Sequence, residues 1–166
     1  MEHARRAAVA DVASIAELAR SARTELAPQR GGAVALAELR WVRGDPAEVE
    51  ASSNRSDELV VVGCLEDAVV GYAHCVLTDL HDGSRIVRID EIYVMPAARG
   101  VGVGEAVLEL VLGWAAEQNC DGVDALALPG MRHTKNFFET FGLVARAITV
   151  HRSLHPVPAP DGSEAP

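Results

Sequence analysis

The chain has 166 residues, a length that suits one compact domain, and 49% of them are apolar, enough for a buried core. Its formal net charge of −9 disfavours a nucleic-acid partner, because binding to phosphates requires a basic surface. An acidic surface favours a cationic substrate, and it also serves simply to keep a protein soluble. No apolar run approaches the ~20 residues that span a bilayer, and the N-terminus lacks the apolar stretch of a signal peptide. We therefore predict a cytoplasmic protein without a membrane partner.

The cysteines do not form a recognisable site. Cys64, Cys75 and Cys120 are scattered, no CxxC occurs, and none has a His at ligand spacing. An odd number of scattered cysteines is typical of reduced thiols. We predict no disulfide framework and no metal site.

The first third of the chain is predicted to be helical. Apolar residues recur at helical spacing over 9–23, and Asp11 is the expected N-cap. A weaker helix is expected over 33–42. The polar residues 43–57 are expected to form a mobile loop.

Strand patterns follow in the middle of the chain. Residues 58–65 and 69–78 are expected to form an antiparallel hairpin with a tight turn at 66–68. His74, within it, is expected to be a core or edge histidine. A third strand is predicted over 86–94, and Pro96 stops it.

A long amphipathic helix is predicted from Val103 to about Asn119. Its apolar stripe has the helical period and consists of Val103, Ala106, Val107, Leu110, Val111, Trp114 and Ala115. A short strand over 123–128 and a helix over 134–141 capped by Gly142 come next.

The C-terminal residues complete a mixed α/β (α+β) layout. Residues 144–154 are expected to be the last strand, and the Pro-rich residues 155–166 a disordered tail. We predict a single domain over residues 1–154.

The loop between the third strand and the long helix contains Gly100, Gly102 and Gly104. Glycines allow close backbone approach, and the free N–H groups of a helix start bind anions such as a pyrophosphate. A Rossmann fingerprint fails because its third glycine would fall at Glu105, and a P-loop fails because no lysine follows. The remaining pattern is Arg-x-x-Gly-x-Gly, beginning at Arg99.

This pattern resembles the acetyl-CoA signature of the GNAT (general amine N-acetyltransferase) superfamily. The preceding Ile92-Tyr93-Val94-x-Pro96 is similar to the family's fourth strand, residues 6–18 to its opening segment, and Phe137-Phe138-Glu139-x-x-Gly142-Leu143 to its late motif. The resemblance covers about residues 4 to 154. It implies a mainly antiparallel central sheet of about six to seven strands flanked by helices. Strands 86–94 and 123–128 would splay apart at the cofactor site.

The resemblance also implies a donor, acetyl-CoA, and residues that bind it. The pantetheine arm would pair with backbone groups of Ile92, Tyr93 and Val94. The pyrophosphate would lie on the amides from Arg99 to Glu105, and Asn136 is a further candidate contact. That stretch consists of Arg99, Gly100, Val101, Gly102, Val103, Gly104 and Glu105.

The implied reaction is direct attack of an amine on the thioester in a ternary complex. Glu91 is the first candidate for the general base, His133 is its rival, and Tyr93 is a candidate acid. The Val94 N–H would polarise the carbonyl. The chain departs from the family where the usual acidic Tyr is replaced by Phe138, which cannot donate a proton.

Two other functions stay open at this point. The missing Tyr is compatible with a non-catalytic acyl-CoA-binding sensor, and the glycines with an NAD(P)-binding oxidoreductase, although the failed fingerprint argues against the latter. The acceptor is unknown, and a cationic amine is one candidate. The acidic residues named for such a site are Glu38, Glu48, Glu50, Asp57 and Glu58. A homodimer is common in the family and is a further expectation.

Overall fold

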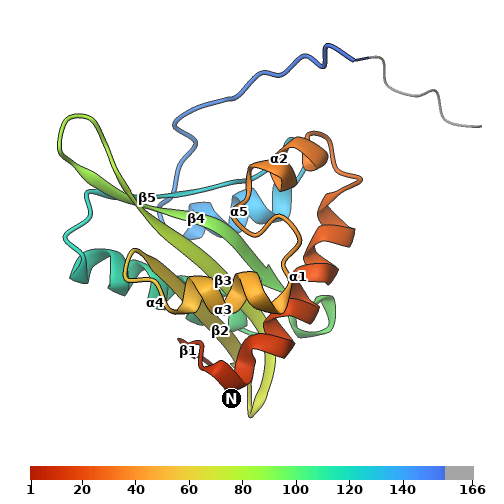
Figure 1. Ribbon diagram of the computed structural model, residues 1–166, viewed down its shortest axis with the longest axis vertical. Helices are drawn as coiled ribbons and strands as arrows, with labels where there is room; N and C mark the ends of the chain where they lie inside the picture. Colours follow the sequence, from red (N-terminus) through yellow and green to blue (C-terminus); the bar gives the residue numbers. More distant parts are fainter. Residues whose placement is uncertain (156–166) are drawn as a thin grey trace, which may run out of the picture.

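A computed structural model describes residues 1–155 of the chain and contains one five-stranded sheet in the order β1-β2-β3-β4-β5 (Figure 1). The strands are β1 (Glu2–Arg6), β2 (Glu58–Leu65), β3 (Ala68–Asp79), β4 (Arg85–Val94) and β5 (Gly122–Ala125). Strands β1 to β4 pair antiparallel, and β5 is parallel to β4. The mixed α/β class and the mainly antiparallel sheet are confirmed. The predicted count of six to seven strands is too high for the described residues.

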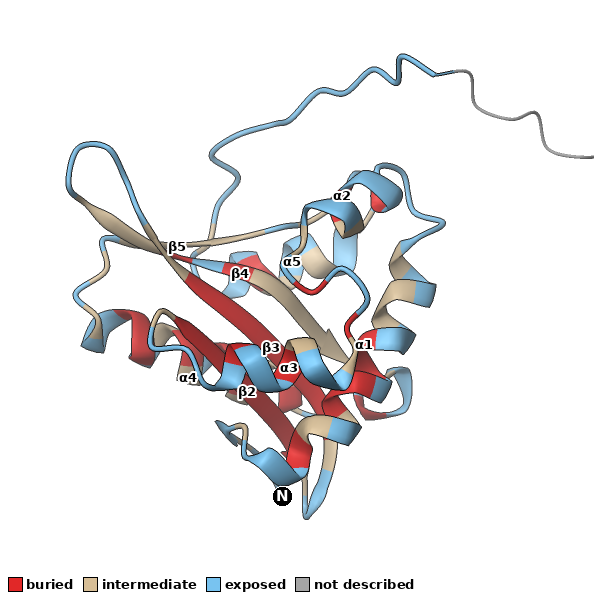
Figure 2. Ribbon diagram, viewed as in Figure 1, coloured by how far each residue is buried: buried red, intermediate tan, exposed pale blue. Residues whose placement is uncertain are grey.

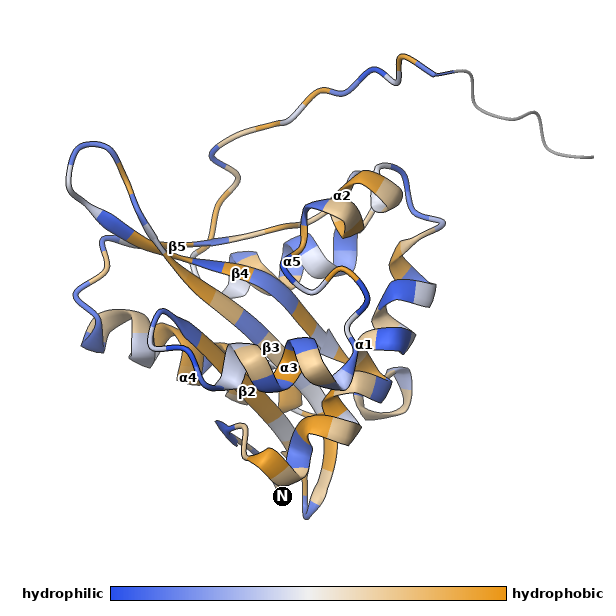
Figure 3. Cartoon of the chain, in the orientation of Figure 1, coloured by the Kyte–Doolittle hydropathy of each residue, from blue (hydrophilic) through white to orange (hydrophobic). Residues whose placement is uncertain are grey.

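Helices cover both faces of this sheet (Figure 1). They are α1 (Val12–Leu26), α2 (Gly32–Glu38), α3 (Pro46–Ser53), α4 (Val103–Glu117) and α5 (Arg132–Thr140), with 3-10 turns at Val9–Asp11 and Pro96–Ala98. Helices α1 and α3 pack on one face, while α4 and α5 pack on the other. The central strands are therefore the most buried part of the molecule, and they are also apolar (Figures 2 and 3).

The long helix α4 follows the predicted stripe closely. Val103, Val107, Val111 and Trp114 are buried against the sheet. Gly63 of β2 lies beneath them, and a Cβ at that position would come within 2.7 Å of Val103 and 2.8 Å of Val107. A glycine at this point in β2 is therefore what allows the helix to approach the strand so closely.

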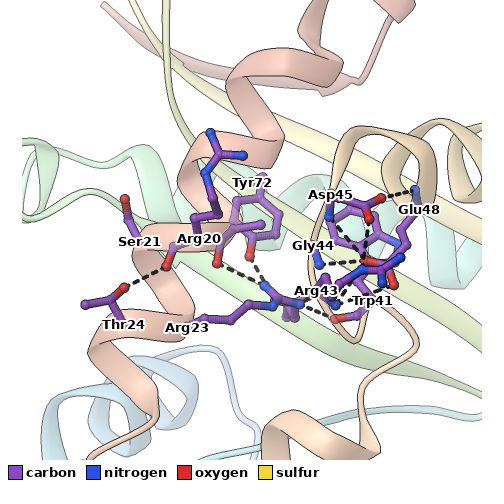
Figure 4. Close-up of polar contacts among 12 residues, drawn as sticks. Arg20, Ser21, Arg23, Thr24, Trp41, Arg43, Gly44, Asp45, Glu48 and Tyr72 are labelled. Carbon is purple, nitrogen blue, oxygen red and sulfur yellow. Dashed lines mark hydrogen bonds and ion pairs between the residues drawn. The ribbon is translucent and has the colours of Figure 1, made fainter.

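The predicted loop over 43–57 is wrong, because it contains α3. Asp45 caps this helix by accepting a hydrogen bond from the Glu48 N–H at 3.1 Å, and Pro46 occupies the first turn. The Glu48 carboxylate in turn accepts from the Asp45 N–H at 3.2 Å and from the Gly44 N–H at 2.6 Å (Figure 4). This capping box with a proline at the helix start is a recognised local signal, and the polar composition of the segment concealed it.

The predicted strand over 144–154 is also wrong. Residues 143–155 have no strand partner in the described structure, and Val144, Ile148 and Val150 are exposed. The segment contacts β5 through an ion pair between Arg146 and Asp124. An alternating pattern becomes a strand only where a neighbour accepts its backbone hydrogen bonds.

Element ends differ at several other points. The second helix ends at Glu38 instead of 42, and β5 ends at Ala125 instead of 128. Gly142 follows α5 with φ of 80°, as predicted for a C-terminal cap. The predicted disordered tail falls, from residue 156 on, outside the described residues.

Asp11 precedes α1 as predicted but does not cap it. Its carboxylate accepts instead from the Ala8 N–H at 2.7 Å and from the Arg5 guanidinium at 2.6 and 2.9 Å. These hydrogen bonds, with that from Arg5 first, hold the pKa of Asp11 below its usual range against the opposing effect of burial. The carboxylate thus ties β1 to the turn that leads into α1.

A buried polar cluster lies under α3. The His74 ring is fully buried, stacks on Trp41 with centroids 4.3 Å apart, and contacts the Glu58 carboxylate at 2.7 Å. Arg40 and Arg55 lie at 3.3 and 2.8 Å from the same carboxylate. The core position predicted for His74 is confirmed. Burial alone would raise the pKa of Glu58, but hydrogen bonds from His74 and Ser52 outweigh it, so that pKa lies below its usual value.

This lowered pKa predicts a loss of stability in acid. A carboxylate whose pKa is depressed on folding stabilises the protein above its unfolded pKa of about 4.3, and this contribution disappears as pH falls through the folded value. At pH values below about 4.3, we expect the free energy of unfolding of the wild type to decrease as the pH is lowered. That of Glu58→Gln is expected to decrease less steeply. Urea titrations from pH 3 to 7 measure both. Parallel pH curves would contradict the assignment.

Candidate functional site

The sheet opens beside the C-terminal half of β4. Strands β4 and β5 pair only from Ile86–Gly122 to Ile89–Ala125. Beyond this point β5 has ended, while β4 continues to Val94. A cavity of about 350 Å³ occupies the gap, bordered by β4, α1, α2 and residues 126–134. A gap is therefore present where the splayed strands were predicted, and it begins where β5 ends.

A bulge at Asp90 changes the face of the sheet to which the side chains of β4 point. His74 of β3 lies opposite Glu91, and its neighbour Cys75 lies opposite Ile89, so Asp90 has no partner on β3. The extra residue shifts the alternation of side chains along the strand. As a result Ile89 packs toward α4, whereas Glu91 contacts α1.

The backbone of β4 offers hydrogen-bonding groups to the gap. Met95 N–H donates to the Val70 carbonyl of β3 at 2.9 Å. Main-chain groups of alternate residues point to opposite neighbours in a strand, so those of Tyr93 point to β3 and those of Ile92 and Val94 point away from it. Of the three residues predicted to pair with a ligand, Ile92 and Val94 therefore present their backbone, and Tyr93 lines the cavity with its side chain.

The glycine loop leads from the end of β4 to the start of α4. Gly100 and Gly102 have φ of 76° and 92°, a region that favours glycine. Ala106 N–H donates to the Gly102 carbonyl at 3.0 Å, so the amides of Val103, Gly104 and Glu105 precede the first helical bond. Such amides, at the positive end of a helix, suit an anion.

Arg99 lies between this loop and the cavity. Its Nε donates to the Val94 carbonyl at 2.8 Å, and its Nη2 donates to the Glu25 carboxylate of α1 at 2.8 Å. The guanidinium also lies 5.4 Å from the centre of the Tyr93 ring. Burial, followed by the charge of Glu25, raises the pKa of Tyr93, so its phenol is protonated at neutral pH.

Glu91 is held in an ion pair that sequence reasoning missed. Arg23 of α1 donates to both of its oxygens, at 2.9 and 3.3 Å, and the Tyr72 hydroxyl donates at 2.9 Å. The side chains of Glu91 and Arg23 are only 7% and 13% exposed. Figure 4 shows Arg23 extending between Tyr72 and Trp41, whose carbonyl it also contacts. Burial would lower the pKa of Arg23, but the charge and hydrogen bond of Glu91, together with the contribution of Tyr72, outweigh burial and raise that pKa.

Helix α5 supplies the opposite wall of the cavity. His133 lines it and is exposed, and Phe138 lines it from a buried position. Asn136 is exposed on the same helix and is not among the residues that line the cavity. Burial raises the pKa of the fully buried Cys75 thiol, which disfavours a cysteine nucleophile.

The acidic residues of the cavity are not those that the sequence suggested for a cationic acceptor. The acidic residues that line it are Glu25, Asp90 and Glu91. Glu48 and Glu58 instead serve α3 and the buried cluster around His74. Neither the charge nor the spacing of Glu25 distinguished it from other exposed helix residues.

A sequence model described as the acetyltransferase (GNAT) family matches residues 17–143, more than half of the chain. The chain belongs to the GNAT acetyltransferase family. Membership supports acyl transfer as the general chemistry of the protein and acetyl-CoA as the donor that the family uses. A search of curated proteins gives no significant match.

Solved structures share the GNAT fold over nearly the whole chain. A Trypanosoma brucei acetyltransferase is 20% identical with a TM-score of 0.66, covering 93% of this chain and 100% of that one. The aminoglycoside enzyme AAC(6')-Iy, solved with a CoA bisubstrate analogue, is 15% identical with a TM-score of 0.71, covering 92% and 98%. A ribosomal-protein-alanine N-acetyltransferase from Brucella melitensis biovar Abortus is 14% identical with a TM-score of 0.68, covering 93% and 100%. At these identities the likeness shows the fold alone.

Residues 1–155 of this GNAT chain lack two other kinds of feature. No described helix is both long and apolar enough to cross a membrane. Within the same residues, no group of three or more His, Cys, Asp or Glu side chains is placed to hold a metal ion.

Proposed function

We propose that the protein transfers an acetyl group from acetyl-CoA to a primary amine by direct attack in a ternary complex. The observation that carries this proposal is the cavity beside the unpaired part of β4, which is lined by Ile92 and by Arg99, the residue at which the glycine loop begins. A pantetheine arm contains amides that pair with such an exposed strand edge. Its pyrophosphate suits the free amides that follow Arg99.

Each predicted contact has a place in this proposal. Ile92 and Val94 bind the pantetheine arm through their backbone, and the loop from Gly100 to Glu105 binds the pyrophosphate. Arg99 adds charge, and Asn136, on the exposed side of α5, contacts the part of the donor outside the cavity.

The chemistry then needs a base, a polarising group and an acid. The Val94 N–H points to the gap, and in this proposal it polarises the thioester carbonyl. Glu91 and His133 are the candidate bases; His133 is exposed, whereas Glu91 is paired with Arg23. Tyr93, kept protonated by its raised pKa, is the candidate acid for the leaving thiolate.

A second function, acyl-CoA binding without catalysis, is favoured by one observation. Phe138 occupies the position of the family's usual Tyr acid and is buried. A domain that binds the donor but lacks an effective acid would act as a sensor. The cytoplasmic location and the homodimer stay predictions.

Calorimetric titration with acetyl-CoA, with NADH as control, tests the proposal. We expect binding in the micromolar range, corresponding to about −8 kcal/mol, and no binding of NADH. A panel of primary amines, assayed by release of the free CoA thiol, then tests turnover. Binding without turnover of any amine would favour the sensor, and failure to bind any acyl-CoA would overturn the proposal.

A further inference from the structure

Arg99, at the start of the glycine loop, contacts both β4 and α1, and a bound donor would have to break these contacts. One guanidinium joins the Val94 carbonyl of β4 to the Glu25 carboxylate near the end of α1, each at 2.8 Å. Arg99, Glu25 and Tyr93 all line the cavity. In the free protein, the arginine therefore occupies the Val94 carbonyl at the unpaired edge of β4.

The donor proposed above competes for both ends of this contact. The Val94 carbonyl faces the gap, and an arm that pairs with the strand uses the same carbonyl. A pyrophosphate next to the glycine loop attracts the guanidinium more strongly than a single exposed carboxylate does, because it offers more charge and several acceptor oxygens. Donor binding is thus expected to move Arg99 from Glu25 to the phosphates.

The other two carboxylates of the cavity have partners that do not depend on the donor. Asp90 pairs with Arg88 at 2.5 Å and its side chain is 4% exposed. Glu91 pairs with Arg23, and its side chain is 7% exposed. Glu25, by contrast, is 44% exposed, and its ion-pair partner is the residue that the donor would remove.

We infer that Glu25 is a specificity-determining residue that donor binding releases to bind a cationic group of the acceptor. The inference rests on the proposed function and narrows it. The acceptor would be a primary amine that carries a second positive charge, held by Glu25 while the first amine reacts. The acceptor would bind after the donor, because Arg99 neutralises Glu25 until then.

Calorimetry with two probes of equal length tests this. The probes are 1,4-diaminobutane, which carries the second charge, and 4-amino-1-butanol, which lacks it. In the presence of CoA, wild-type protein is expected to bind the diamine at least about tenfold more tightly than the amino alcohol. Without CoA this preference is expected to vanish.

Three variants make the test specific. Glu25→Gln should lose the preference while binding acetyl-CoA as tightly as the wild type or more tightly. Glu17→Gln, the same charge change on an exposed position of the same helix, should keep it. Arg99→Gln should bind the diamine without CoA, because Glu25 is then already free.

The outcomes separate this inference from the proposed function. If the wild type binds no acyl-CoA, the proposed function fails. If it binds acetyl-CoA but shows no diamine preference with CoA, or if Glu25→Gln retains that preference, the role of Glu25 is overturned. Equal diamine binding with and without CoA would overturn the order of binding.

Discussion

Replacement of Glu91 by Gln is expected to lower the free energy of unfolding by about 3 to 5 kcal/mol, the usual cost of leaving one member of a buried ion pair without its partner. Arg23, 13% exposed, would keep its charge but lose the carboxylate that faces it at 2.9 Å. The Tyr72 hydroxyl would also lose a charged acceptor. Urea denaturation monitored by tryptophan fluorescence measures the change.

A double-mutant cycle shows whether the pair itself is responsible. Arg23→Met alone is expected to be similarly harmful, because it leaves the buried Glu91 carboxylate without its ion-pair partner. The double variant Arg23→Met/Glu91→Gln is expected to be more stable than the sum of the two losses predicts. Strict additivity of the two changes would contradict a direct interaction.

The same variant bears on the choice of base. If Glu91 only positions Arg23 and Tyr72, then Glu91→Gln, assayed well below its unfolding temperature, will keep the wild-type pH profile of kcat. If Glu91 accepts the proton, the low-pH limb of that profile will disappear. His133→Gln provides the matched comparison on the opposite wall of the cavity.

Replacement of Gly102 by Val is expected to weaken acetyl-CoA binding at least tenfold, or about 1.4 kcal/mol. Gly102 has φ of 92°, so a β-branched side chain either strains the loop by about 1 to 3 kcal/mol or changes its conformation. A Cβ there would also lie 3.0 Å from the Glu2 side chain. Either response displaces the amides proposed to bind the pyrophosphate, and calorimetry measures the loss.

Gly113 offers a control within the same helix. It is exposed in α4, and a Cβ there would meet no atom within 4 Å. Gly113→Ala is expected to leave acetyl-CoA affinity unchanged and to raise stability by about 0.5 to 1 kcal/mol through helix propensity. Wild-type affinity in Gly102→Val would show that the loop has only a structural role.

The elements that follow from local pattern were predictable from the sequence. The apolar period of α4, the hairpin of β2 and β3, and the stop of β4 near Pro96 depend on residues close together in the chain. The glycine loop and its flanking strand and helix identified the family for the same reason. The start of α3 was equally local, and its capping box was the signal that was overlooked.

Other features depend on which elements pack together, and the sequence alone did not determine them. Residues 144–154 alternate like a strand but have no strand partner in the described structure, and the bulge at Asp90 exists only relative to β3. Arg23 and Glu91 are separated by 68 positions, and Glu25 and Arg99 by 74. Such contacts form because α1 crosses the end of β4, and an exposed glutamate on a helix carries no local mark of the arginine it will meet. Local pattern therefore determined the scaffold and the family, whereas long-range packing decided which arginine each carboxylate of the cavity meets.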